Sequence, residues 1–263
     1  MMSAMSDLRP ALDLVVTALE RIRDGGGTLP RASRGALSLL SVESAPVTER
    51  IASLPATTAS KADLLRPLRE RVSVCVKCPH LARTRTQTVF GVGDPDAELM
   101  FIGEAPGADE DARGEPFVGR AGQLLTKIIE TMGFGRDEVY IANVLKCRPD
   151  MPPGSSGNRP PTPVEMETCL PYLAQQIDIV RPKVLIALGA TAVEGLLGTR
   201  GTMRDLRGRW HSYQDTPLMI TYHPSYLLRN QSPTEKRKVW EDMLLVLERI
   251  DRSITEKQKR YFL

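Results

Sequence analysis

The sequence has no apolar run near the roughly 20 residues that a membrane-spanning helix needs. It lacks a signal-peptide pattern at its start, so a cytoplasmic protein without membrane contact is expected. Cysteine is scarce, with four residues in 263, and disulfides are not expected without an export signal. Neither sign of charge dominates: 35 Lys and Arg stand against 32 Asp and Glu, so the total charge excludes no class of partner.

The composition divides the chain into three segments. Residues 1–60 contain a helical pattern, ALDLVVTALERIR, followed by Gly-, Ser- and Pro-rich stretches, which indicates a flexible N-terminal extension with a short helix. Residues 61–252 alternate short apolar runs with amphipathic helical patterns, as one substantial domain does. Residues 253–263 form a basic C-terminal tail.

Alternating strand and helix patterns predict an α/β fold, a three-layer α/β/α sandwich with a central, mainly parallel four-stranded sheet. The strand patterns are AELMFIGE, VYIANVLKC, KVLIALG and LMITYHP. Ligands of such sheets bind beyond the carboxyl ends of the strands. This rule selects four places as candidate sites, after Ile102, Ile141, Leu188 and Tyr222.

The cysteines predict a metal site. Cys75 and Cys78 form a C-x-x-C pair, Cys147 ends a predicted strand, and Cys169 lies in the helix that follows a long loop. By count alone, four thiolates fit a structural zinc ion or an iron–sulfur cluster equally well. Four buried thiols without a metal are the alternative, and a C-x-x-C redox couple would leave the other two cysteines unexplained.

Several motifs occur in an order that resembles the uracil-DNA glycosylase superfamily, and with the cysteines its family 4, the iron–sulfur type. The motifs are GEAPGADED, GEPFVGRAGQLL, VYIANVLKCRP, LGATA, LRG and HPSYLLR. They run from about Cys75 to Arg229, roughly three-fifths of the chain. The resemblance implies a monofunctional enzyme that flips uracil out of DNA, hydrolyses its N-glycosidic bond and leaves an abasic site. It also implies a structural 4Fe-4S cluster on the four cysteines, with zinc as the less favoured occupant.

The resemblance assigns roles to single residues. Cleavage leaves an oxocarbenium-like sugar and an anionic base, so negative charge near the sugar and donors around the base are needed. Glu104 is expected to face the sugar or hold a water molecule, and His223 to donate a hydrogen bond to uracil O2. The amide of Asn143 matches the O4 and N3–H edge of uracil, and Phe117 can stack on the flipped base. The expected catalytic residues are Glu104 and His223, and the uracil-binding residues are Glu104, Gly107, Glu110, Phe117, Asn143 and His223.

Contacts with DNA are expected from HPSYLLR and RGTMRDLRGRW. Ser225 can bind a phosphate, the YLLR run with Arg229 can fill the gap left by the base, and Arg207 belongs to a basic stripe. A solvated basic turn is the alternative for that stripe. Lys146 lies close enough to these motifs in sequence to be considered as a lyase nucleophile, although no lyase activity is expected.

Two departures leave points open. Ala105 and Gly107 stand where superfamily members with a GQDPYH motif carry aspartate and tyrosine, although family 4 also has a small residue at the first position. The water activator is therefore Glu104 or none, and exclusion of thymine is expected from Glu110 or Phe117. The segment 150–164 is longer than the usual connector and is expected to be a surface insertion. It contains no histidine, so covalent trapping on DNA is not expected.

Two functions of other classes compete with the glycosylase. One is a non-catalytic module that binds damaged or single-stranded DNA, with a structural metal site. The other is an electron-transfer protein that docks through the acidic loop. Neither explains why Asn143, Phe117 and His223 all fall at or beyond predicted strand ends. The expected partner is uracil-containing DNA, and the expected state is a monomer.

Overall fold

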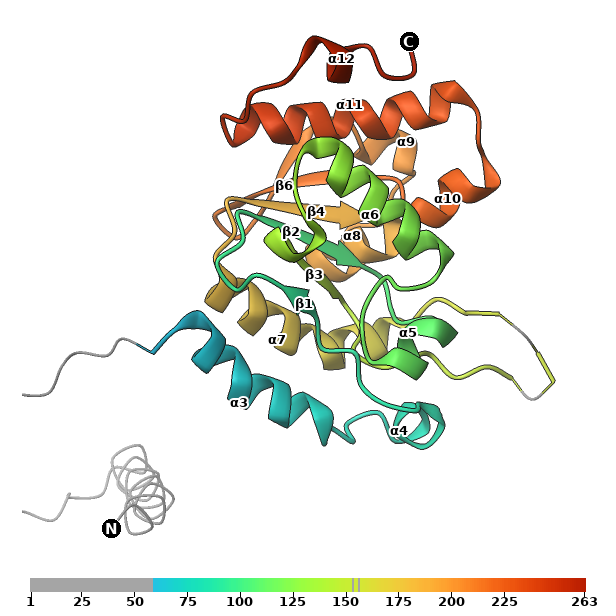
Figure 1. The fold of residues 1–263 in the computed structure, drawn as a ribbon. Coiled ribbons are helices and arrows are strands. Elements are labelled where there is room, and N and C mark those ends of the chain that lie inside the picture. The colour runs from blue at the N-terminus through green and yellow to red at the C-terminus, as the bar shows by residue number, and fades with distance from the viewer. Residues whose placement is uncertain (1–58, 153, 156) are drawn as a thin grey trace, which may run out of the picture. The chain divides into compact units, whose positions relative to one another are not determined.

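A six-stranded sheet lies at the centre of the part of the chain described by the computed structural model, residues 59–263 except 153 and 156. The strand order is β1-β3-β2-β4-β6-β5, and Figure 1 labels all of these strands except β5. The strands are β1 Val92–Gly93, β2 Leu99–Gly103, β3 Tyr140–Asn143, β4 Val184–Leu188, β5 Trp210–Tyr213 and β6 Thr216–Thr221.

The four inner strands, β3, β2, β4 and β6, are parallel and are those that the sequence predicts. The α/β prediction is confirmed, but the predicted number of strands was wrong. The short strands β1 and β5 pair antiparallel with β3 and β6 and form the two edges. Both strands are short and only partly buried, so their sequences do not show the continuous apolar pattern of an inner strand.

Helices cover both faces of the sheet, which gives three layers (Figure 1). Helices α3 Lys61–Ser73, α7 Pro163–Val180 and α8 Ala190–Leu197 pack on one face; α6 Arg120–Met132 and α11 Pro233–Arg249 pack on the other. Shorter helices lie in the connections: α4 Pro79–Thr84, α5 Ala108–Arg113, η2 Arg136–Glu138, α9 Met203–Leu206, α10 Pro224–Arg229 and α12 Glu256–Lys259.

Alternation along β2 shows how one strand serves two cores. Met100 and Ile102 belong to the core under α7, whereas Leu99 and Phe101 belong to the core under α6 and α11. Successive side chains of a strand point to opposite faces, so a strand covered on both sides is apolar throughout. This burial fixes the register of the sheet and therefore the place where each strand ends.

The predicted N-terminal extension, 1–60, and C-terminal tail, 253–263, differ in what the structure shows of them. The helix and linker expected within 1–60 fall almost entirely outside the described residues. The segment 253–263 packs back onto α11: Trp240 Nε1 donates to the Gln258 oxygen at 2.6 Å, and Arg237 Nη1 donates to the Tyr261 oxygen at 3.0 Å. Among the described helices, none combines the length and apolar character that crossing a bilayer requires.

Candidate active site

A cleft of about 550 Å³ lies at the carboxyl edge of the inner strands. Its walls come from the segments that follow β2, β3, β4 and β6, the four places that this topology favours for ligands. The residues predicted from sequence that line it are Glu104, Gly107, Glu110, Phe117, Asn143, His223, Ser225 and Arg229. The fold therefore gathers all residues expected to recognise a base or perform chemistry, although they lie far apart along the chain.

Asn143 presents an amide to this cleft at the end of β3. It is paired in register with Gly103, the last residue of β2. A Cβ atom at position 103 would lie 2.4 Å from Asn143 Oδ1 and 2.5 Å from Phe117 Cζ, so only glycine permits this approach. Asn143 is buried and its backbone oxygen accepts from Lys146 Nζ, yet within the described residues its side-chain amide has no protein partner. The amide is available to a ligand.

Glu110 ties together the loop between β2 and α6. Its Oε2 atom accepts from Gly107 N at 3.0 Å, and its Oε1 atom accepts from Val118 N and Gly119 N, both at 2.9 Å. A carboxylate that satisfies three backbone donors across such a loop fixes the loop's shape. Glu110 therefore positions the wall of the cleft, and it also caps the start of α5.

Phe117 is held in an uncommon backbone conformation. Its φ angle is 54°, in the left-handed region that costs an ordinary residue on the order of 1 kcal/mol or more. The hydrogen bonds from Val118 and Gly119 to Glu110 hold one side, and Arg136 Nη2 donates to the Pro116 oxygen at 2.6 Å on the other. The ring is thereby fixed in place, buried against the cleft with its centroid 5.6 Å from that of His223.

His223 follows β6 and caps α10. The backbone N–H of Ser225 donates to Nδ1 at 3.1 Å, and Ser225 Oγ lies 2.7 Å from the same atom. Because Nδ1 accepts, the neutral ring carries its proton on Nε2. Burial, followed by the nearby positive charge of Arg229, lowers the pKa of His223 to about 4. The imidazole is therefore neutral at physiological pH, with Nε2–H as a donor.

Glu104 directly follows β2 and also lines the cleft. Burial raises the pKa of its carboxyl above the ordinary value, and a hydrogen bond from Thr191 partly offsets this. Its backbone oxygen accepts from Leu145 N at 3.0 Å, which fixes the segment beside the end of β3. The site thus holds a carboxylate in poorly solvated surroundings, where its field is stronger than in water.

The long loop between β3 and α7 supplies a wall that the sequence did not predict. Asn158, Arg159 and Pro160 line the cleft, in the segment expected to be a surface insertion. A Cβ atom on Gly107 would lie 3.1 Å from Asn158 Nδ2, which places this amide against the turn after β2. The GNRPP motif carried no periodicity or charge pattern that would have placed it near the other motifs.

Two residues considered from sequence lie elsewhere. Arg207 does not line the cleft; its Nη2 and Nε atoms donate to Asp242 at 2.8 and 3.1 Å, and Asp242 also accepts from Thr221 Oγ1 at 2.6 Å. This buried ion pair supports the end of β6 and does not favour a contact between Arg207 and DNA. Lys146 is fully buried, and its Nζ atom donates to Asn143 and Gln176 oxygens, away from the lining of the cleft.

The four cysteines surround one small cavity of about 20 Å³. All are free thiols, and among the described residues no three of their sulfur atoms lie within 4.8 Å of one another. Tetrahedral zinc with Zn–S bonds of about 2.3 Å would bring the sulfur atoms to about 3.8 Å. Arg85 Nη1 donates to Cys147 Sγ at 3.0 Å, and the Lys146 N–H donates to Cys169 Sγ at 3.3 Å. Four thiols around one cavity are a donor set that can hold a metal ion or an iron–sulfur cluster.

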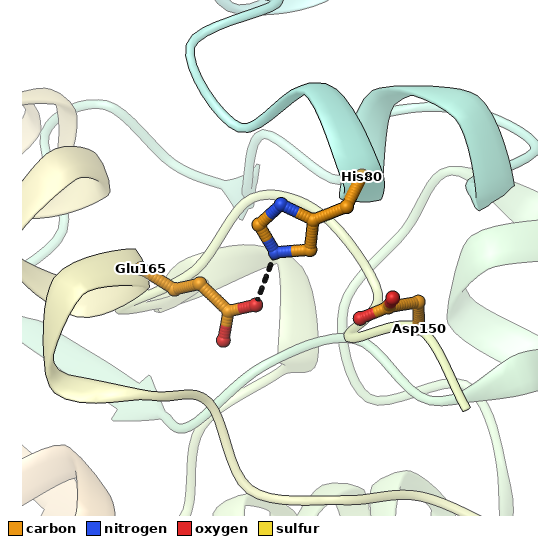
Figure 2. A group of neighbouring side chains, drawn as sticks. All are labelled: His80, Asp150 and Glu165. Carbon is orange, nitrogen blue, oxygen red and sulfur yellow. Dashed lines mark hydrogen bonds and ion pairs between the residues drawn. The ribbon is translucent and has the colours of Figure 1, made fainter. Parts of the chain in front are cut away.

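A second group of possible metal ligands contains His80, Asp150 and Glu165 (Figure 2). His80 Nε2 lies 2.7 Å from Glu165 Oε1. The guanidinium of Arg159 already pairs with both carboxylates, so the positive charge at this place comes from the protein itself. The group is an ion-pair network and does not fit a metal.

The described domain is similar to proteins of a known family. A family model described as the uracil DNA glycosylase superfamily matches residues 90–244. A type-4 uracil-DNA glycosylase of Thermotoga maritima is 43% identical over 186 residues, which is 70% of this chain and 93% of the relative. One from Sulfurisphaera tokodaii is 41% identical, covering 68% of this chain and 81% of the relative. A type-5 enzyme of Thermus thermophilus is 26% identical, covering 59% and 84%.

Proposed function

Since the chain belongs to the uracil DNA glycosylase superfamily, we propose that it flips uracil out of DNA and hydrolyses the bond between the base and deoxyribose. The products are free uracil and an abasic site. The observation that carries this proposal is the free amide of Asn143 at the bottom of a cleft that also holds Phe117, His223 and Glu104. A flipped base needs such a concave site, and the chemistry needs these polar groups.

Base recognition is assigned to Asn143 and Phe117. An amide offers a donor for uracil O4 and an acceptor for N3–H, whereas cytosine presents the opposite pattern at these atoms. The ring of Phe117 offers a flat surface for stacking, worth about 1–3 kcal/mol per base. Because Glu110 and Arg136 hold the loop on both sides of Phe117, the stacking surface exists before the base arrives. The loop that Glu110 fixes is also where thymine's methyl group would have to be excluded.

Stabilisation of the leaving base is assigned to His223. The base departs with negative charge on its O2 atom, and the Nε2–H of the neutral imidazole can donate to it. The tautomer is fixed by the N–H of Ser225, so the proton is already in place. A donor aimed at charge that develops in the transition state lowers the barrier because it need not reorient.

Negative charge near the sugar is assigned to Glu104. Its carboxylate opposes the positive charge that develops on deoxyribose, and with the amide of Asn158 it can hold the attacking water. Wild-type protein should release uracil from a uracil-containing oligonucleotide in EDTA, and Glu104→Gln should be slower by about 10²-fold. The wild-type rate should fall as pH drops through the raised pKa of Glu104, because the ionised fraction falls. This acid limb should be absent from Glu104→Gln.

These measurements separate the proposal from its rival. A protein that binds the oligonucleotide tightly but frees no uracil would be a DNA-binding module. Glu115→Gln serves as the matched control, since this neighbouring carboxylate does not line the cleft. We further propose that the enzyme acts in the cytoplasm and as a monomer, since the proposed reaction needs only one pocket.

Cys75, Cys78, Cys147 and Cys169 are proposed to hold a structural 4Fe-4S cluster, whose role is to tie the segment after α3 to the loop after β3 and to α7. All four side chains line one cavity, and this number and type of donor supports such a group. Burial raises the pKa of Cys169 to about 11, so binding must displace protons from the thiols. The residues around them then stabilise bound thiolates, as partners of metal ligands do.

Arg85→Ala should weaken the cluster. It removes the donor to Cys147 Sγ and a second bond, from Nη2 to the Cys75 oxygen at 2.7 Å. Loss of one such partner typically costs about 10–100-fold in metal affinity. We expect lower iron content and faster bleaching of the absorbance near 400 nm under chelator. Arg83→Ala, an exposed position in α4 two residues before Arg85, is the control, and equal bleaching of both variants would refute the assignment.

A further inference from the structure

The wall formed by Asn158 and Pro160 belongs to a loop that contains little regular structure. The connection from β3 to α7 spans 144–162 and is rich in Pro and Gly. Loops of this length need specific contacts to adopt one conformation. The side chain that supplies most of them is Arg159, between the two residues of the wall.

Arg159 uses all five of its N–H donors within the protein. Its Nε donates to the Asp150 oxygen at 2.7 Å, and its Nη1 donates to the Pro160 oxygen at 3.0 Å and to Glu165 Oε2 at 2.9 Å. Its Nη2 donates to Asp150 Oδ1 and to Glu165 Oε1, the latter at 2.7 Å. A guanidinium has five such donors, so none remains for a DNA phosphate.

Glu165 is the buried centre of the network. Besides Arg159, it accepts from Thr162 N at 2.6 Å, which caps α7, and from His80 Nε2 at 2.7 Å (Figure 2). Its side chain is only 3% exposed. Removing one partner of a buried pair leaves an uncompensated charge, so the geometry of this pair is strongly specified.

The same network reaches the cysteines. Cys78 is the N-cap of α4, which carries His80, and Cys169 lies one helical turn after Glu165 on α7. Any group held by the cysteines fixes α4 relative to α7. It thereby fixes the contact between His80 and Glu165, from which Arg159 holds the loop.

The geometry points to Arg159 and Glu165 as positioning residues that hold the Asn158–Pro160 wall of the cleft and link it, through His80, to the cysteine-bearing helices. This inference rests on the proposed function, because the wall matters only if the cleft binds a reacting nucleotide. It accounts for a histidine, a buried carboxylate and a fully committed arginine that base recognition and chemistry do not use.

A double-mutant cycle on uracil release tests the inference. Arg159→Ala should lower the single-turnover rate by about 10²-fold, the cost of a small misplacement in an active site, while DNA affinity and 400 nm absorbance stay near wild type. In an Asn158→Ala background, the same change should cost less than about threefold, because the wall's side chain is already missing. Arg159→Lys should not rescue, since an ammonium cannot bridge two carboxylates in this geometry.

Hydrogen exchange provides a readout that is independent of activity. In Arg159→Ala and Glu165→Gln, amides 157–159 should exchange faster, whereas Arg66→Ala, which removes an exposed ion pair on α3, should change neither exchange there nor rate. Equal costs of Arg159→Ala in both backgrounds, or unchanged exchange, would overturn the inference. Absence of uracil release by the wild type would defeat the proposed function instead, and the exchange arm would still decide whether the pair holds the loop.

Discussion

Asn143→Asp should lose uracil excision by about 10⁴-fold and gain a slow release of cytosine. A carboxylate can only accept, so the donor for uracil O4 is lost and a negative charge faces that oxygen. Sites built to hydrogen-bond a substrate group reject a mismatched group by factors of this order. Cytosine presents an amino group at the same place, to which the carboxylate can bind. Single-turnover assays on matched oligonucleotides with uracil or cytosine measure both rates.

The substitution conserves volume beside Gly103, where any added atom would collide with Phe117, so the fold should persist. Thermal melting checks this, and Asn230→Asp, an exposed change outside the lining of the cleft, is the matched control. If Asn143→Asp excised uracil at the wild-type rate, the amide would not read the base and Asn158 would become the candidate.

His223→Ala should slow uracil release by about 10²- to 10³-fold, the usual cost of removing one donor aimed at developing negative charge. The effect should appear in the chemical step and leave DNA affinity largely unchanged, because the bond strengthens only as the base departs. Ser225→Ala should cost much less, since the backbone N–H of Ser225 still fixes the tautomer. His211→Ala, outside the cleft, is the control; a parallel loss there would signal unfolding instead.

The lowered pKa of His223 also predicts how stability depends on pH. In the unfolded chain the imidazole takes a proton near pH 6.5, whereas in the folded protein it does so only near pH 4. Between these values the unfolded state binds more protons, so the free energy of unfolding should decrease as pH falls from about 6.5 to about 4. Chemical denaturation across this range should show a shallower decrease in His223→Ala. If the free energy of unfolding of His223→Ala fell as steeply with pH as that of the wild type, a group other than His223 would account for the dependence.

The inner strands were predictable because burial on both faces makes them apolar throughout. The main helices were predictable because their buried residues recur at helical spacing. The ends of those strands then located Glu104, Asn143 and His223 through a rule about parallel sheets. The edge hairpin was not predictable. Its turn has a φ angle of 51° at Gln214, where Gly or Asn is the usual residue and would have indicated a turn in the sequence. Its strand β5 is only partly buried, so it lacks the apolar pattern of an inner strand.

The loop that carries Asn158 was missed for a different reason. Its position depends on ion pairs between Arg159, Asp150 and Glu165, and charged residues in a Pro-rich segment look the same in sequence whether they face solvent or one another. Arg207 illustrates the converse, since this member of a basic stripe in the sequence pairs with the buried Asp242. Pairing of charges is a property of the folded chain, and neither spacing nor composition reports it.

The burial of Lys146 has a consequence for what happens after the base has left. Of the side chains described along the cleft, none is a lysine, so no amine is placed to form a Schiff base with the opened sugar. Under the proposed function we therefore expect the phosphodiester backbone to leave the enzyme unbroken, at a position that no longer carries a base. If so, a separate phosphodiester-cleaving activity has to cut the strand, and the time for which the baseless product stays bound sets how long the lesion is shielded before incision.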